Sequence, residues 1–361
     1  MGSIEVIKVD FMQNTLYRAS LQAMLSKFDI SFLNGKTVMV TGATGMLGHC
    51  LIDALAIWNK GQQNSCRIIA VSRNVEMAKK QFSYCWKDDK FSFLPWDICD
   101  GVCPETEQID YVIHAASNAD PAKITAHPVD TLVANTIGTK NLIEHGIQHR
   151  MQRFLYVSSG EVYGQPDEDM SDFVEDYCGP LDLSSMRSCY PEGKRAGEVL
   201  CQSYIYQENI DAVIVRPCHL FGPTAKRHDS RATSEFLWRA SIGETIVMKS
   251  AGLRERSQCY IVDAVYALLL VLRDGRRGEA YNIAAPSCQA TIRAFAEQTA
   301  KCGDCQLICI QPTEYEAQGY SKISRAVLDS HKLQAIGWVP QYDLQSGIRE
   351  TLQILSTIQE R

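Results

Sequence analysis

Six short, β-rich runs that alternate with longer amphipathic segments are the feature that most constrains the fold of this chain. Each run is apolar enough to be a strand that is buried on both faces. The runs lie at 37–41, 67–71, 91–94, 111–114, 154–157 and 212–215, and helical segments at 47–58, 130–145 and 191–207 lie between them. Strands separated by helices at this spacing predict βαβ units, and therefore an α/β fold with a doubly wound parallel sheet. Such a sheet binds ligands at the carboxyl ends of its strands.

The same pattern divides the chain into three parts. Residues 1–34 are expected to be an extension that contains one amphipathic helix, because apolar residues recur there at helical spacing. Residues 35–217 are expected to form the nucleotide-binding domain, and part of 255–285 is a candidate to return to it. The alternation then becomes irregular, so residues 218–361 are expected to form mainly a smaller C-terminal α/β lobe that binds substrate.

Composition and charge exclude several classes of protein. The 361 residues are 45% hydrophobic and 22% charged, as in ordinary globular proteins. The formal net charge of −6 leaves no basic excess for binding nucleic acid. The longest dense apolar stretches, such as 267–272, are far shorter than the roughly 18 residues that a membrane-spanning helix needs. We therefore expect a globular protein that binds neither nucleic acid nor membrane.

Fourteen cysteines raise the question of disulfides and metal sites. The chain is long enough to bury a core and lacks the pattern of a signal peptide, so we expect a cytoplasmic protein with free thiols. Cys302 and Cys305 form one C-x-x-C pair, but zinc usually needs a second pair at similar spacing, and none stands nearby. No metal is expected.

A glycine-rich turn follows the first β-rich run directly, where residues 41–48 read T-G-A-T-G-M-L-G. The first glycine permits a tight turn, the second lets the backbone approach a pyrophosphate, and the third lets the helix pack on the strand. The helix that begins here offers free N–H groups and a partial positive charge to phosphates. Because it lies between a strand and a helix, the turn predicts a Rossmann-type dinucleotide site rather than a merely structural bend. The residues expected to contact the cofactor there are Gly42, Thr44, Gly45, Met46, Leu47 and Gly48.

The end of the second run selects between the two nicotinamide dinucleotides. NAD-binding chains usually carry an acidic residue there for the adenosine ribose, whereas this chain has Ser72 and Arg73. A hydroxyl and a guanidinium suit the 2′-phosphate of NADP, so the sequence favours NADP over NAD. Arg73 stacked on the adenine or facing solvent is the alternative. Asp97, after the third run, is a candidate to accept from the adenine amino group or simply to cap a turn.

Tyr190 and Lys194 stand four residues apart at the start of a predicted helix, which places both on one face. A tyrosine has an ordinary pKa near 10, and an adjacent ammonium favours its phenolate form. Ser159 ends the fifth run, at the same edge of the sheet as the glycine-rich turn. Tyr-x-x-x-Lys alone usually marks a solvated helix face, but together with Ser159 and the cofactor turn it predicts catalysis.

With these residues in place, the sequence resembles the extended short-chain dehydrogenase/reductase family, and within it the NAD(P)-dependent epimerases and dehydratases that modify nucleotide sugars. The matching motifs are T-G-A-T-G-M-L-G (41–48), I-H-A-A-S (113–117), N-T-I-G-T-K-N (135–141), V-S-S-G-E-V-Y-G (157–164), C-Y-P-E-G-K-R (189–195), R-P-C-H-L-F-G-P (216–223) and G-E-A-Y-N-I (278–283). The resemblance covers nearly everything from Lys36 to about Leu352. The stretch from Arg187 to Arg195 is most similar to that of UDP-glucuronate decarboxylases.

The resemblance implies roles for further residues. Glu161 stands where decarboxylases and 4,6-dehydratases carry an active-site glutamate, and Arg187 is implied to act beside it. Further implied cofactor contacts are Ile98, Ala115, Ala116, Ser117, Asn135 and Pro217, in addition to Tyr190 and Lys194. The implied substrate contacts are Asn118, Glu161, His219, Arg231 and Arg256. For Arg231 a surface salt bridge, and for His219 a core imidazole, are the alternatives. Family members commonly pair through two helices per subunit, which implies a homodimer.

Three departures from the family pattern bear on the reaction. Gly160 stands where 4,6-dehydratases add an aspartate, which argues against ordinary dehydration. His219 replaces an asparagine that reaches the substrate diphosphate, and Glu235 replaces an asparagine that faces the nucleotide. The first hypothesis is therefore a redox-neutral enzyme that oxidises C4 of a nucleotide sugar transiently, as UDP-glucuronate decarboxylases do. The alternatives are a nucleotide-sugar 4-epimerase, an NADPH-dependent 4-keto-sugar reductase and, less favoured, a non-catalytic NADP(H)-binding module.

Overall fold

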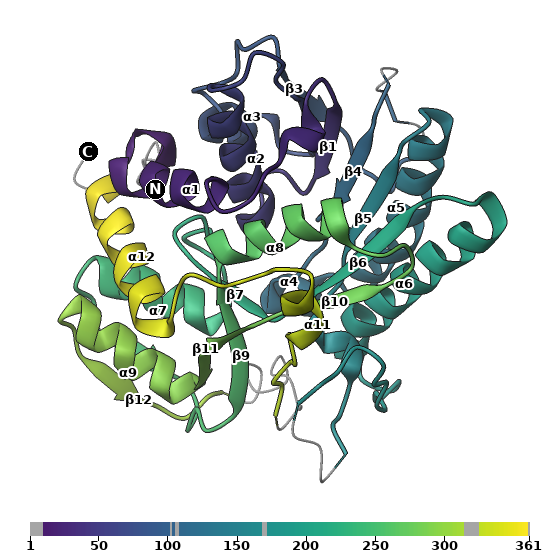
Figure 1. The fold of residues 1–361 in the computed structure, drawn as a ribbon. Coiled ribbons are helices and arrows are strands. Elements are labelled where there is room, and N and C mark those ends of the chain that lie inside the picture. The colour runs from purple at the N-terminus through teal and green to yellow at the C-terminus, as the bar shows by residue number, and fades with distance from the viewer. Residues whose placement is uncertain (1–9, 102, 105–107, 168–171, 314–324, 360–361) are drawn as a thin grey trace.

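A seven-stranded parallel sheet forms the centre of the protein (Figure 1). The computed structural model describes residues 10–101, 103–104, 108–167, 172–313 and 325–359. The strands are β1 (Thr37–Thr41), β2 (Arg67–Ser72), β3 (Phe91–Pro95), β4 (Tyr111–His114), β5 (Arg153–Val157), β6 (Ala212–Pro217) and β10 (Ala280–Ile283). Their spatial order is β3-β2-β1-β4-β5-β6-β10, and every neighbouring pair is parallel. The predicted doubly wound α/β fold is confirmed, and all six β-rich runs are strands of this sheet.

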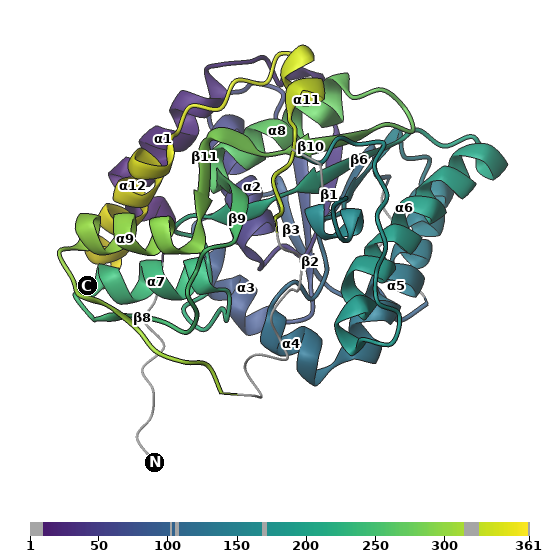
Figure 2. The same ribbon diagram turned by 90° about the horizontal axis from the view of Figure 1, so that it is seen from below.

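Helices cover both faces of the sheet (Figure 2). One face carries α2 (Met46–Asn59) and α8 (Ile261–Asp274), and the other carries α5 (Pro128–Gln148) and α6 (Cys189–Glu208). Alternate side chains of β1 enter the two cores, because successive residues of a strand point to opposite faces. Val38 and Val40 pack in the core of α2 and α8, whereas Met39 packs with Leu142 of α5 and Cys201 of α6.

Smaller elements follow β6 along the chain. A three-stranded sheet has the order β11 (Ala285–Thr291), β9 (Glu255–Tyr260) and β7 (His219–Phe221), and a two-stranded sheet pairs β12 (Leu307–Cys309) with β8 (Ile246–Met248). The helices α7 (Ala232–Ser241), α9 (Ile292–Gly303) and α12 (Leu344–Gln359) pack together beside these strands (Figure 2). Strand β10 and helix α8, both within or close to 255–285, belong to the central sheet and its helical layer. The chain therefore leaves the large sheet after β6 and returns to it at β10.

The remaining short elements lie in connections. These are α3 (Val75–Gln81), α4 (Pro121–Ala126), α11 (His331–Ala335) and the 3₁₀ helices η1 (Phe11–Gln13), η2 (Ser31–Leu33), η3 (Gly160–Tyr163) and η4 (Met186–Ser188). Helix η3 begins directly after Ser159, and η4 runs directly into α6. The expected catalytic residues Glu161 and Arg187 thus lie on short helical turns, whereas Tyr190 and Lys194 lie in the first turns of α6.

The described part of the N-terminal extension contains helix α1 (Thr15–Leu25), in agreement with the helical spacing of its apolar residues. It packs on α2 and α8. Buried Tyr17 donates a hydrogen bond to Asp53 of α2 at 2.9 Å, and Tyr84 donates to the other carboxylate oxygen at 2.5 Å. The extension is therefore joined to the helix that follows the glycine-rich turn.

Within the described ranges, no helix has the length and apolarity that a bilayer crossing requires. No group of three or more His, Cys, Asp and Glu side chains in that part of the chain is arranged to hold a metal ion. All fourteen cysteines are free thiols, and Cys50, Cys66, Cys85, Cys201, Cys259 and Cys288 are buried.

Candidate active site

The turn between β1 and α2 forms a cradle whose walls are backbone. Gly42 has a φ of +67°, and a Cβ at this position would lie 2.6 Å from the carbonyl oxygen of Ala115. A Cβ at Gly48 would lie 2.5 Å from the carbonyl oxygen of Gly42, so a larger residue would push α2 away from the turn. Gly45 precedes α2 without a side-chain cap, which leaves N–H groups of the first helical turn for an anion. These features fit the pyrophosphate of a dinucleotide.

The other predicted cofactor residues lie around the carboxyl ends of neighbouring strands. The hydroxyls of Thr44 and Ser72 are 2.9 Å apart and join the glycine-rich turn to the end of β2. After β4, Ser117 donates to the side-chain oxygen of Asn135 at 3.0 Å. The backbone N–H of Ala116, next to Ala115, donates to Thr41 at 3.2 Å, and the carbonyl oxygen of Ile98 accepts from Asn141 at 3.0 Å. Met46 and Leu47 begin α2, and Pro217 ends β6.

Arg73 and Asp97 contact each other. Arg73 Nη1 lies 3.2 Å from an Asp97 carboxylate oxygen, and the side chains are 69% and 31% exposed. Asp97 also accepts from the backbone N–H of Cys99 at 3.1 Å, which is the turn-capping alternative. Partial burial raises the pKa of Asp97, but the Cys99 N–H and the Arg73 guanidinium outweigh it and lower the pKa overall. An ion pair this exposed contributes about 0–1 kcal/mol, so Arg73 can exchange Asp97 for a phosphate at little cost.

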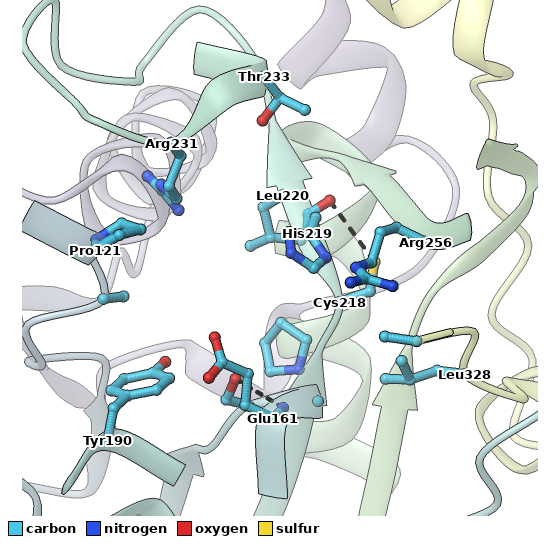
Figure 3. A pocket seen from close by; sticks show the side chains of 15 residues that line it. Pro121, Glu161, Tyr190, Cys218, His219, Leu220, Arg231, Thr233, Arg256 and Leu328 are labelled. Carbon is cyan, nitrogen blue, oxygen red and sulfur yellow. Dashed lines mark hydrogen bonds between the residues drawn. The ribbon is translucent and has the colours of Figure 1, made fainter. Parts of the chain in front are cut away.

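Residues from seven separate segments of the chain line one cavity of about 130 Å³ (Figure 3). The predicted residues among them are Ser159, Glu161, Tyr190, Pro217, His219, Arg231 and Arg256. Figure 3 shows Tyr190 and Glu161 on one side of the cavity, with Arg231, His219 and Arg256 across from them. Asn118 is not among the described residues that line this cavity, although its neighbour Ala119 is. The fold thus gathers most of the predicted catalytic and substrate residues in one place.

The hydroxyl of Tyr190 faces an electrostatic environment with opposing contributions. Burial raises the pKa of Tyr190 to about 12, and the Glu161 carboxylate acts in the same direction. The Ser159 hydrogen bond and the positive charges of Arg187 and Arg231 act in the opposite direction. Ser159 itself is fixed at the start of η3, where its hydroxyl accepts from the backbone N–H of Glu161 at 3.2 Å. The phenolate therefore depends on positive charge near the cavity.

Lys194 lies beneath the cavity rather than in it. Its side chain is buried, and Nζ donates to the carbonyl oxygen of Val157 at 2.7 Å. Nζ also lies 4.9 Å from the centroid of the Tyr156 ring. Burial lowers the pKa of Lys194 to about 7, and the carboxylate of Glu198 opposes this effect. The sequence leads us to expect Lys194 to stabilise the Tyr190 phenolate, and in this structure its ammonium is directed at the strand end that leads to Ser159.

Glu161 and Arg187 form an ion pair beside Tyr190. Arg187 Nη2 donates to the Glu161 carboxylate at 2.6 Å, and the guanidinium carbon lies 5.6 Å from the centroid of the Tyr190 ring. The Nε and Nη1 atoms of Arg187 are buried and have no hydrogen-bond partner among the residues that the structure describes. Two donors of a guanidinium therefore remain for a ligand oxygen, because buried donors left unpaired are costly.

The opposite side of the cavity is strongly cationic. Arg231 is paired with Asp229, and Arg256 donates from Nη1 to the carbonyl oxygen of Glu255 at 2.9 Å. Arg231 therefore takes part in an ion pair, but a largely buried one rather than a surface salt bridge, and it also lines the cavity. His219 opens onto the cavity, yet the surrounding protein and then the charges of three arginines lower its pKa to about 4. At neutral pH, His219 is an uncharged group among guanidinium groups, a setting suited to an anionic ligand.

One protein-family model matches a region of the chain that includes most of the central sheet and of the candidate site. The model of the NAD dependent epimerase/dehydratase family matches residues 38–284, which is more than half of the chain. The chain belongs to this family. UDP-glucuronic acid decarboxylase 6 of Arabidopsis thaliana is 30% identical over 328 residues, 90% of this chain and 89% of that protein. UDP-glucuronic acid decarboxylase 1 of Danio rerio is 29% identical over 322 residues, 89% of this chain and 73% of that protein.

Solved structures of similar fold include a dehydratase and an epimerase. DesIV, the dTDP-glucose 4,6-dehydratase of Streptomyces venezuelae with NAD and TYD bound, superimposes with a TM-score of 0.75 at 21% identity, covering 88% of this chain and 96% of that one. The UDP-glucuronic acid 4-epimerase of Bacillus cereus with UDP-glucuronic acid and NAD has a TM-score of 0.74 at 20% identity, covering 89% and 99%. At these identities the likeness establishes the fold. The resemblance stated from the motifs is thus confirmed at the level of family and fold.

Sequence reasoning missed several residues of this family member's site. Cys218, Leu220 and Thr233 line the cavity. Cys218 and Leu220 lie in the matched motif at 216–223, but nothing in the residue types marked their side chains as part of the site, and Thr233 lies in no motif. Behind the cavity, Glu198 pairs with Arg216 at 2.7 Å. The available signal was the spacing of Tyr190, Lys194 and Glu198, which repeats every four residues along one helix.

Proposed function

We propose that this protein modifies a nucleotide sugar by transient oxidation at C4, and that it acts as a UDP-glucuronate decarboxylase without net consumption of cofactor. The observation that carries the proposal is the convergence of Tyr190, Ser159 and Glu161 with two arginines, Arg231 and Arg256, on one cavity. A third arginine, Arg187, pairs with Glu161 beside it. The names of the relatives support the choice of substrate, since two proteins about 30% identical over most of the chain are UDP-glucuronic acid decarboxylases.

The residues have the following roles in the proposal. The glycine-rich turn binds a nicotinamide dinucleotide, which when bound takes up a hydride from the sugar and gives it back. Tyr190 as phenolate removes the proton of the C4 hydroxyl, and Ser159 donates a hydrogen bond to the oxygen as it becomes a carbonyl. Arg231 and Arg256 bind the diphosphate, for which a guanidinium fork is suited. Arg187 uses its unpaired donors to orient the substrate carboxylate.

A ketone at C4 places the C6 carboxylate in the β position. The bond between C5 and C6 then breaks with loss of CO₂, and its electron pair enters the enolate of the C4 ketone. Protonation at C5 follows, with Glu161 and Arg187 placed beside the reacting carbons in the proposal. Gly160 leaves no acid for the departing hydroxyl of a 4,6-dehydration at the position where dehydratases carry one.

The test is incubation of the purified protein with UDP-glucuronate and either dinucleotide, followed by measurement of CO₂ and of the UDP-sugar products by mass spectrometry. Equal amounts of CO₂ and UDP-pentose support the proposal. UDP-galacturonate without CO₂ would instead identify a 4-epimerase. Stoichiometric loss of NADPH with a 4-keto sugar would identify a reductase, and absence of turnover while cofactor remains bound would overturn the choice of substrate.

For the cofactor we propose NADP rather than NAD. The Ser72 hydroxyl and the weakly paired Arg73 guanidinium at the end of β2 support this choice. Titration of protein fluorescence with NADPH and NADH is expected to show tighter binding of NADPH. In Arg73→Ala the preference is expected to fall about tenfold or more, because a charge-assisted hydrogen bond is lost. Equal binding of both cofactors by the unchanged protein would contradict the proposal.

We also propose that the protein is a cytoplasmic homodimer that pairs through α5 and α6. Apolar side chains on the outer surfaces of these adjacent helices support the pairing, with Val129, Ile137, Val199 and Tyr206 exposed by 70%, 46%, 62% and 94%. Light scattering after gel filtration is expected to give twice the monomer mass. The same measurement on Val199→Asp is expected to give a monomer, and a monomeric unchanged protein would contradict the pairing.

A further inference from the structure

The carboxylate of Glu198 joins three segments behind the cavity. Its Oε1 atom accepts from the Ser158 hydroxyl at 2.5 Å and from Arg216 Nε at 2.9 Å. Its Oε2 atom accepts from Arg216 Nη2 at 2.7 Å. Glu198 lies on α6, Ser158 follows β5, and Arg216 lies near the end of β6. One side chain therefore ties a helix to the ends of two neighbouring strands.

The ion pair at the centre of this network is well shielded and firmly held. The side chains of Glu198 and Arg216 are only 12% and 13% exposed. Arg216 Nη1 donates further to the Tyr163 hydroxyl at 3.0 Å, and Tyr163 donates to Asn282 of β10 at 2.6 Å. A shielded bidentate pair whose remaining donors are also satisfied keeps a fixed geometry.

Each segment that Glu198 joins carries a residue of the proposed reaction or of the cavity wall. Ser158 directly precedes Ser159, and Arg216 directly precedes Pro217 of the cavity. On α6, Lys194 lies one helical turn before Glu198 and Tyr190 lies two turns before it. Movement of the Glu198 carboxylate would therefore disturb the serine, the lysine and the cavity wall together.

Glu198 also sets the charge around Lys194. Facing that ammonium are Glu198 and Cys201 on its own helix, the Tyr156 ring on β5 and His114 at the end of β4. Burial lowers the pKa of His114 to about 3, so it is neutral, and burial raises the pKa of the Cys201 thiol, so it is neutral as well. Glu198 is thus the anion in this group that favours the protonated form of Lys194.

We propose that Glu198, held by Arg216, is a positioning residue that fixes the Ser159 segment and keeps the ammonium of Lys194 directed at the catalytic strand end. It acts through Ser158 and Lys194 and touches no reacting atom. The kinetic part of this inference rests on the proposed function, whereas the charge on Lys194 can be measured without any substrate.

The first experiment titrates Lys194 in the full-length protein that carries ¹³C,¹⁵N-labelled lysine, with its resonance assigned by Lys194→Met. In Glu198→Gln, which keeps the shape and removes the charge, the pKa of Lys194 is expected to fall by about one unit or more. Glu208→Gln is the matched control, because Glu208 is an exposed residue at the end of the same helix. It is expected to leave the titration unchanged.

The second experiment measures kcat and KM with UDP-glucuronate across pH. In Glu198→Gln, kcat is expected to fall about 10- to 100-fold, as misplacement of a catalytic group does, with a much smaller change in KM. The alkaline limb of the kcat profile is expected to move to lower pH, because Lys194 loses its proton more easily. Glu198→Asp keeps the charge on a shorter side chain and is expected to restore part of kcat and most of the Lys194 pKa.

The outcomes separate the two proposals. If the unchanged protein does not turn over UDP-glucuronate, the proposed function fails while the titration still decides the role of Glu198. The same Lys194 pKa in the unchanged protein and in Glu198→Gln would overturn the inference. If Glu198→Gln does not fold, Glu198→Asp is titrated in its place. A small downward shift of the Lys194 pKa then supports the inference, and no shift overturns it.

Discussion

The cofactor side of the candidate site is made mainly of backbone, whereas the substrate side is made mainly of side chains. On the cofactor side, the turn between β1 and α2 is a run of eight residues whose backbone makes the site, and its glycines matter for what they lack. On the substrate side, Arg187, His219, Arg231 and Arg256 come from separate segments, and their side chains make the site. A backbone site tolerates no added atoms, whereas a side-chain site can change its ligand through single replacements.

The largest expected effect is a loss of turnover on the substrate side without any loss of cofactor binding. In Tyr190→Phe, turnover is expected to fall about 10²- to 10⁴-fold, because proton transfer by the phenol is lost. Cofactor affinity is expected to remain, since the β1–α2 turn is untouched. Steady-state kinetics and fluorescence titration with NADPH measure the two quantities. Tyr206→Phe on the same helix, at a side chain 94% exposed, is the control. Retained turnover in Tyr190→Phe would refute the role of this residue.

Removal of a cation from the substrate side is the next test. Arg256→Gln is expected to raise KM for the nucleotide sugar about 10- to 100-fold with little change in kcat, because a hydrogen bond to a charged group is worth about 1.5–3 kcal/mol. Cofactor affinity is again expected to stay the same. Arg293→Gln on α9, a partly exposed residue that pairs with Glu297, is the control. A fall in kcat at unchanged KM would move Arg256 from binding into the chemical step.

The reverse test adds atoms to the backbone side. Gly48→Ala is expected to weaken the binding of NADPH about tenfold and to destabilise the fold by about 1–3 kcal/mol, because its Cβ would overlap the Gly42 carbonyl. Calorimetry and fluorescence titration check both effects. Gly61→Ala, where a Cβ would lie 3.7 Å from its nearest neighbour atom, is expected to do neither. Unchanged cofactor affinity in Gly48→Ala would break the contrast drawn between the two sides.

A smaller effect tests the electrostatics within the side-chain face. Arg187 lowers the pKa of Tyr190, so Arg187→Gln is expected to raise it. The acid limb of the kcat profile, where Tyr190 must lose its proton, is then expected to move to higher pH by about one unit. The profile is measured with the substrate at saturation. A shift to lower pH would show that Glu161, freed from its partner, does not act on Tyr190 as the structure indicates.

The smallest effect concerns a residue that belongs to neither side. Burial raises the pKa of Asp53 to about 7, partly offset by hydrogen bonds from Tyr84 and Tyr17. Because the folded-state pKa is the higher one, its contribution to stability is fully present below about pH 4 and is lost as pH rises through about 7. Asp53→Asn is expected to remove this part of the pH dependence of the free energy of unfolding, measured in urea at several pH values. An unchanged pH dependence would contradict the assignment.

The sequence predicts this protein well where a signal is local. The strands are apolar runs of regular spacing, and the glycine-rich turn, Ser159 and the pair Tyr190 and Lys194 are motifs whose geometry follows from a helix or a strand end. Contacts between distant segments are less accessible. Nothing in the spacing shows that Arg73 pairs with Asp97, that Arg187 pairs with Glu161, or that Asn118 misses the cavity, because these depend on how separate loops pack.

The hydrogen bonds of Glu198 behind the cavity are a second case in which contacts between distant segments could not be predicted from the sequence. The four-residue spacing of Glu198 from Lys194 is visible in the sequence, but its partners Ser158 and Arg216 lie far away along the chain. A carboxylate on a helix is usually solvated, and only the packing of α6 on the sheet makes this one a shared acceptor. Helix periodicity therefore identifies the position, and tertiary structure gives it a role.

The return of the chain to β10 has a practical consequence for anyone who wishes to dissect this enzyme. A fragment that ends at Pro217 would lack β10 and α8, so β6 would become an exposed edge strand with unpaired backbone N–H and C=O groups. The apolar surface that α8 covers would also be exposed to solvent. Such a fragment invites aggregation instead of behaving as a dinucleotide-binding module. A split version of the protein has to be divided between β7 and β9, outside the central sheet, and both fragments have to be produced together. The second fragment then supplies α8 and β10, which complete the sheet.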